Sequence, residues 1–147
     1  DNSNDVYLDF LKEKEGFRDT AYKPIDSEEY YTIGYGNYGQ DVKEGDTITK
    51  EQATAQLQSN IDTKLAEIRQ AIPDFDSLPL EARKHLLGSW FRGSLSGSPK
   101  TISLLNDGRF KEASKEFLNN NEYRTTSLRG VKNRMNNTAN AMLGLIG

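Results

Sequence analysis

The chain has 147 residues, a length that fits one domain of ordinary size or two small lobes around a shared element. It contains no cysteine, which excludes disulfides and thiolate zinc sites. A single histidine, His85, argues against a histidine-based metal site and against a Ser-His-Asp triad. The apolar runs are only a few residues long, too short to span a bilayer or to form the core of a signal peptide.

The net charge of −3 hides an uneven distribution along the chain. Residues 1–76 carry 17 acidic and 8 basic residues, a net charge of −9, whereas residues 77–147 carry 5 acidic and 11 basic residues, a net charge of +6. A basic surface attracts polyanions such as nucleic acid, an anionic lipid surface or a bacterial cell wall. Mutual attraction between two oppositely charged lobes explains the same asymmetry equally well.

The N-terminal part predicts a helix followed by a β-hairpin. Apolar residues recur at helical spacing over residues 4–15, and Gly16 stands where a C-cap glycine belongs. Residues 20–23 and 30–36 are rich in Tyr, Thr and Ile, so the polar segment 24–29 between them is typical of a hairpin loop. Gly34, Gly36 and Gly39 permit tight bends, and we expect a short third strand around Thr47-Ile48.

The middle of the chain predicts one long helix. Thr49-Lys50-Glu51-Gln52 matches a capping box. A continuous apolar stripe then follows at steps of three or four residues until Pro73; its members are Ala53, Leu57, Ile61, Leu65, Ile68 and Ile72. The length of this helix, about residues 50–72, favours a connection between two lobes.

The rest of the chain is helical in pattern. We expect helices after Pro79 and over about 100–106, 109–118 and 130–142, with a Gly/Ser-rich loop at 93–98. The predicted fold class is α+β. It has a small β-hairpin lobe at about 12–52 and a larger helical lobe at about 77–147 that also takes in the 4–15 helix, within a single domain 1–147.

Carboxyl groups in the first half could carry out acid-base chemistry. Cleavage of a glycosidic bond needs one carboxyl group that stays protonated and another that stays ionised. Glu15 ends a helix near aromatic residues that could desolvate it and raise its pKa, whereas Asp26 lies in the polar hairpin loop. Thr32 on the returning strand could hold a water molecule by its hydroxyl. This chemistry requires no metal and no cofactor.

Three segments carry a resemblance to a known family: Glu15-Gly16-Phe17-Arg18, Ala21-Tyr22 and Tyr31-Thr32-Ile33-Gly34-Tyr35-Gly36. They resemble the active-site segment of phage-type lysozymes, the muramidases of glycoside hydrolase family 24. More weakly, the long helix resembles the helix that connects the lobes of that family. The segment Trp90-Phe91-Arg92-Gly93 and the later segments 101–110 and 130–134 also resemble family helices.

The resemblance implies that Glu15 is the general acid and that Thr32 positions the attacking water. The family pattern is a Glu, eight residues, an Asp or Cys, five residues and a Thr. Counted from Glu15 it reaches Pro24, but counted back from Thr32 it reaches Asp26. The strand that carries Thr32 fixes the register, so we assign Asp26 as the second carboxylate, with Asp19 as the rival. The usual His of the family after the second glycine is Asn37 here.

Several aromatic and polar residues are candidates for contacts with substrate. Tyr35, Tyr38 and Phe91 could stack on sugar faces, and Trp90 could do so or pack in the core. Thr101 could donate a hydrogen bond to substrate or act as the N-cap of a short helix. His85, beside two leucines, is typical of a packed or solvated residue.

The resemblance implies a lysozyme that inverts configuration and cleaves the β-1,4 bond between N-acetylmuramic acid and N-acetylglucosamine in a cleft between its lobes. Its role would be phage-mediated lysis or cell-wall penetration. Two alternatives stay open: a lytic transglycosylase that uses Glu15 alone, and a lysozyme-like module that binds peptidoglycan without cutting it. We expect a monomer, or a domain of a larger virion or secreted protein, that does not bind nucleic acid and does not insert into a membrane. The chain shows no export signal, so its action on the wall from the host cytoplasm or the virion would need a separate delivery route.

Overall fold

A computed structural model describes residues 3–23, 27–126 and 129–146. The chain forms two compact units, Asp1–Thr63 and Lys64–Gly147. The boundary between the units lies within the long helix α2, Lys50–Ala71. The first unit contains helix α1. That residues 1–147 form a single domain, and that the 4–15 helix belongs to the helical lobe, both stay predictions.

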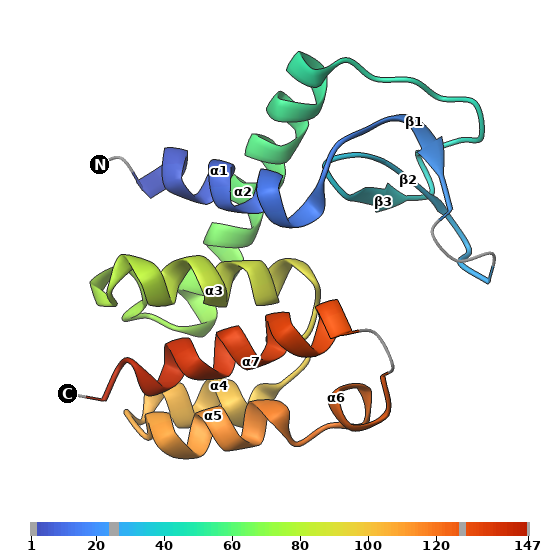
Figure 1. The fold of residues 1–147 in the computed structure, drawn as a ribbon. Helices are drawn as coiled ribbons and strands as arrows, with labels where there is room; N and C mark the ends of the chain where they lie inside the picture. Colours follow the sequence, from blue (N-terminus) through green and yellow to red (C-terminus); the bar gives the residue numbers. More distant parts are fainter. Residues whose placement is uncertain (1–2, 24–26, 127–128, 147) are drawn as a thin grey trace. The chain divides into compact units, whose positions relative to one another are not determined.

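The first unit combines one helix with a three-stranded antiparallel sheet in the order β1-β2-β3 (Figure 1). Its elements are α1 (Ser3–Glu15), β1 (Arg18–Tyr22), β2 (Tyr31–Gly34) and β3 (Asn37–Gly39). The helix ends as predicted, because Gly16 adopts a φ of +69° and its N–H donates to the Lys12 carbonyl at 3.0 Å. The helix, the first two strands and the α+β class confirm the prediction.

The predicted third strand was in the wrong place. The third strand of the sheet is Asn37–Gly39, whereas Thr47 forms only an isolated bridge with Thr20. The reason is the turn at residues 35–36. Gly34 and Gly36 adopt φ angles of +67° and +74°, which reverse the chain at once and pair the next three residues with β2.

Helix α2 confirms the predicted capping box and apolar stripe. The Thr49 N–H donates to Gln52 Oε1, and the Gln52 N–H donates to Thr49 Oγ1, both at 3.1 Å. All six stripe residues named above are buried, each with an exposed fraction of 3% or less. The helix ends at Ala71, two residues before Pro73, which cannot continue it.

The second unit is helical throughout its described residues. Its elements are the 3₁₀ helix η1 (Phe75–Ser77), α3 (Leu80–Phe91), α4 (Pro99–Asn106), α5 (Phe110–Leu118), α6 (Asn121–Thr125) and α7 (Arg129–Leu143). Helix α7 packs against both α3 and α5 (Figure 1). Ser114 on α5 donates to the Ala139 carbonyl on α7 at 2.9 Å. Among the described residues, no helix is both long and apolar enough to cross a membrane.

We expect the substitution Thr49→Ala to lower the free energy of unfolding by about 1 kcal/mol, because it removes the side-chain acceptor for the Gln52 N–H. Urea denaturation measures this loss. The matched control is Thr63→Ala, because the Thr63 hydroxyl only donates back to the Ser59 carbonyl within the helix. A loss at Thr63 as large as the loss at Thr49 would contradict the role of the cap.

Candidate functional site

Glu15 is the last residue of α1, and its carboxylate lies against the β2–β3 turn. A Cβ atom built on Gly36 would come within 2.7 Å of Glu15 Oε2 and 3.2 Å of its Cδ. Real side chains do not tolerate the shorter distance, so Glu15 keeps this position only because residue 36 has no side chain. The positive φ of Gly36 is a second reason for glycine here. The structure thus brings the two ends of the family-like segment together.

Two adjacent aromatic rings, each with a lysine over it, support the same turn. The ring centroids of Phe17 and Tyr35 are 5.3 Å apart. Lys12 Nζ lies 5.6 Å from the Tyr35 centroid, and Lys50 Nζ lies 5.7 Å from the Phe17 centroid. These contacts join α1, the chain entering β1, the turn and the start of α2. Tyr35 therefore has a packing role beside the carboxylate of Glu15, and its contact with substrate stays a prediction.

Thr32 lies in the central strand of the sheet. Its Cα partners are Tyr22 on β1 and Tyr38 on β3. The residue is 8% exposed, and its hydroxyl makes no hydrogen bond with any described residue. A hydroxyl that the sheet holds in place without using it can bond a water molecule. This arrangement is compatible with the predicted role of Thr32.

Of the two candidate aspartates, the structure describes only Asp19. Asp26 lies outside the described residues, so its assignment stays a prediction. Asp19 is exposed on β1, where its carboxylate accepts a hydrogen bond from the Thr20 hydroxyl at 3.2 Å. Asp19 lines a pocket of about 190 Å³ whose other walls come from Thr20, residues 47–49 and Gln52, and neither Glu15 nor Thr32 lines it.

Tyr38 is the most exposed of the predicted aromatic contacts in the first unit. Its side chain is 48% exposed on β3, and its ring lies 5.5 Å from the ring of Tyr30 at a tilt of 57°. The Tyr30 N–H also donates to the Tyr38 hydroxyl at 3.3 Å. The pair forms a partly fixed aromatic surface that a sugar ring could stack on.

Asn37 has a structural partner that the sequence did not indicate. Its Oδ1 accepts a hydrogen bond from Asn60 Nδ2 at 3.2 Å, in a partly buried position. This bond ties the start of β3 to helix α2 within the first unit. Although the family pattern has a histidine at residue 37, Asn37 still links β3 to α2 in this chain.

In the second unit Trp90 is a core residue. It is 7% exposed, and its Nε1–H donates to Glu67 Oε1 at 2.9 Å. This hydrogen bond is the main reason why the pKa of Glu67 is lowered, and the nearby Lys64 adds to the effect. Phe91, the last residue of α3, is half-buried, so its contact with substrate stays a prediction.

Thr101 does not have the position that either of its interpretations requires. The N-cap of α4 is Ser98, and Thr101 is the third residue of the helix, so its interpretation as an N-cap was wrong. Pro99 initiates the helix two residues earlier than Thr101. Thr101 is fully buried, so it offers no surface to a ligand in this structure.

Sequence reasoning missed two residues of the site. Gly36 was recognised as a bend but not as the space for Glu15, and Phe17 was quoted only as part of a motif. The available signal was the pair of glycines around Tyr35, since a turn with two positive φ angles brings backbone close to a neighbouring element.

The chain is similar in sequence to known proteins. The sequence profile of the phage lysozyme family, described as "Phage lysozyme", matches residues 12–138. The endolysin of Bacillus phage B103 is 33% identical over 123 residues, which are 80% of this chain and 44% of that protein. The endolysin of Bacillus phage PZA is 32% identical over 133 residues, 86% of this chain and 49% of that protein. The chain thus spans about half the length of these curated relatives.

The fold also has a close match among solved structures. The muramidase domain of SpmX from Asticaccaulis excentricus aligns with a TM-score of 0.71 at 21% identity. The alignment covers 94% of this chain and 95% of that domain. The predicted lysozyme-like α+β fold is therefore confirmed.

We expect Gly36→Ala to displace the carboxylate of Glu15, because the new Cβ would occupy its position. An alanine held at this positive φ should also lower the free energy of unfolding by about 1 kcal/mol. The displacement is measured as a change in the carbon NMR signal of the Glu15 carboxyl group. Gly39→Ala is the control, since its Cβ would meet nothing within 4 Å and its φ is not positive. An unchanged Glu15 signal in the Gly36 variant would contradict the packing described.

Proposed function

The chain belongs to the phage lysozyme family, and we propose that it hydrolyses peptidoglycan at the β-1,4 bond between N-acetylmuramic acid and N-acetylglucosamine. The observation that carries the proposal is the contact between Glu15 and Gly36, which presses a half-buried carboxyl group against backbone at the end of a helix. A glutamate side chain that extended into solvent would not restrict a neighbouring position to glycine. The named relatives are endolysins, which supports a role in phage-mediated bacterial lysis.

Glu15 acts as the general acid in this proposal. It gives a proton to the glycosidic oxygen as the bond to the sugar carbon breaks, and the leaving sugar departs with a new hydroxyl. Glu15 is the last residue of α1, and contact with the β2–β3 turn covers one side of its carboxylate.

Asp26 and Thr32 activate the water that attacks the sugar carbon from the opposite face. The carboxylate of Asp26 takes the proton of the water, and the hydroxyl of Thr32 orients it. Two observations support Asp26 over Asp19: the spacing to Thr32 along the chain, and the pocket of Asp19, which neither Glu15 nor Thr32 lines. Attack from the opposite face inverts the configuration, and it requires the two carboxyl groups to lie roughly 6.5–9.5 Å apart.

The candidate substrate contacts are aromatic side chains and the basic part of the chain. Tyr38 offers an exposed ring, and Tyr35 and Phe91 are further aromatic candidates. The net charge of +6 over residues 77–147 adds attraction to the anionic wall. Salt should weaken that attraction, because ions screen exposed charges over about 8 Å at physiological ionic strength.

We expect Glu15→Gln to reduce the clearing of a purified peptidoglycan suspension by at least about 100-fold, because glutamine cannot donate the proton. The matched control is Glu13→Gln, an exposed position on the same helix, which should clear at the wild-type rate. Equal clearing by wild type and the Glu15 variant would remove Glu15 from the mechanism. If wild type also fails to clear, the chain is a binding module.

The products distinguish hydrolysis from transglycosylation. Water addition gives new reducing ends, and inversion makes the first product the α-anomer. Products with a 1,6-anhydro ring would instead show a lytic transglycosylase that uses Glu15 alone.

The identity of the second carboxylate has its own test. We expect Asp26→Asn to lower kcat by about 100-fold with little change in KM, because the base acts in the transition state and not in binding. Asp19→Asn should leave kcat close to that of wild type, since that carboxylate lines a different pocket. A large loss at Asp19 with none at Asp26 would reverse the assignment.

A further inference from the structure

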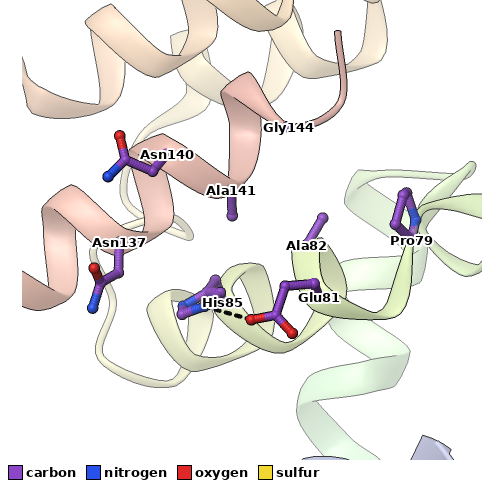
Figure 2. Close-up of a pocket in the computed structure, with 8 residues that line it drawn as sticks. All are labelled: Pro79, Glu81, Ala82, His85, Asn137, Asn140, Ala141 and Gly144. Carbon is purple, nitrogen blue, oxygen red and sulfur yellow. Dashed lines mark ion pairs between the residues drawn. The ribbon is translucent and has the colours of Figure 1, made fainter. Parts of the chain in front are cut away.

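The second unit contains a pocket that the proposed reaction does not use. It encloses about 340 Å³ between helices α3 and α7, at the lower end of the usual range for ligand pockets. Glu81 and His85 form the wall on α3, and Asn137 and Asn140 belong to the wall on α7 (Figure 2). The pocket thus combines four polar side chains from two packed helices.

The two asparagines are available to a ligand. They are three residues apart on α7, so their side chains share one face of the helix. Both are exposed, and neither carboxamide has a hydrogen-bond partner among the described residues. Each carboxamide supplies two donors and a carbonyl acceptor. They can therefore bind a group that has both a donor and an acceptor, such as another amide.

The charges of the opposite wall already have partners. Glu81 Oε2 lies 2.9 Å from Lys84 Nζ, and Glu81 Oε1 lies 3.4 Å from His85 Nε2. The hydrogen bond from Lys84 is the main reason why the pKa of Glu81 is lowered. A cationic ligand would have to compete with Lys84, and an anionic ligand would face the carboxylate. The wall therefore favours a neutral polar ligand.

The remaining lining is small and mainly apolar. It comes from Pro79, Ala82, Ala141 and Gly144. Ala82 on α3 and Ala141 on α7 face the space between the two helices (Figure 2). Side chains of this size leave room for a methyl group next to the carboxamides. None of the lining residues is a Phe, Tyr or Trp, the side chains that usually stack on a sugar ring.

We propose that this pocket binds the acetamido group of an N-acetylated amino sugar and so gives the chain a second contact with peptidoglycan glycan. An acetamido group has an N–H donor, a carbonyl acceptor and a methyl group, which match the carboxamides and the small apolar residues. This inference rests on the proposed function, since that function makes glycan the substrate. A single acetamido sugar buries little surface, so the expected Kd is on the order of 1 mM or weaker.

The test is an NMR titration of the wild-type protein, because a monosaccharide probe has no glycosidic bond that the protein could cut. The probe is N-acetylglucosamine, and the comparison probe is glucose, which lacks the acetamido group. We expect N-acetylglucosamine to shift the side-chain NH₂ signals of Asn137 and Asn140, and glucose to leave them in place. Signals from the first unit report a different site and do not count.

A pair of variants distinguishes binding in the pocket from binding elsewhere on the surface of α7. Asn140→Ala should weaken the response at Asn137 at least about fivefold, and it should not disturb folding, since Asn140 is exposed and alanine favours helices. Asn133→Ala is the control, because Asn133 is exposed on the same helix but does not line the pocket. Equal responses to the two sugars, or equal effects of the two variants, would overturn the proposal.

The outcome is independent of catalysis. If wild type does not cut peptidoglycan but N-acetylglucosamine still shifts the pocket signals, the proposed reaction is wrong and the acetamido site stands. If wild type cuts peptidoglycan and the pocket signals do not move, the reaction stands and the second contact is wrong.

Discussion

The absence of a side chain at residue 36 is the constraint on which the candidate site depends. The carboxylate of Glu15 occupies the space that a Cβ would need, and the same residue has the positive φ that reverses the chain between β2 and β3. One glycine therefore leaves room for the Glu15 carboxylate and determines where the third strand begins. The other features of the first unit, including the ring contact between Phe17 and Tyr35, hold this turn in place.

Several lysine and arginine side chains of the first unit lie over aromatic rings. Besides the two lysines beside Phe17 and Tyr35, the Arg18 guanidinium lies 4.1 Å from the ring centroid of Tyr22, and Lys23 Nζ lies 4.9 Å from that of Tyr31. Each such contact at an exposed position contributes about 0.5–1 kcal/mol. The rings thus stabilise a small sheet that has little apolar area of its own.

Features with a local cause could be predicted from the sequence. The capping box at Thr49, the C-cap at Gly16 and the stripe of α2 each depend on residues a few positions apart, and all three are present. The third strand was misplaced because β propensity says nothing about a turn made by two glycines. The bond between Asn37 and Asn60 joins residues 23 positions apart, so no local pattern indicates it. For the candidate site, the roles of Glu15 and Thr32 stay predictions from spacing, whereas the contact of Glu15 with Gly36 needed coordinates.

The same hydrogen bond between Asn37 and Asn60 determines how the link between β3 and α2 responds to pH. Phage-type lysozymes usually have a histidine at this position, and the imidazole changes its charge between pH 5 and 8. A carboxamide has no proton to gain or lose in that range, so the link from β3 to α2 keeps its strength as the medium acidifies. The link between the sheet and α2 is thus insensitive to acid at a position where the family pattern has a titrating histidine.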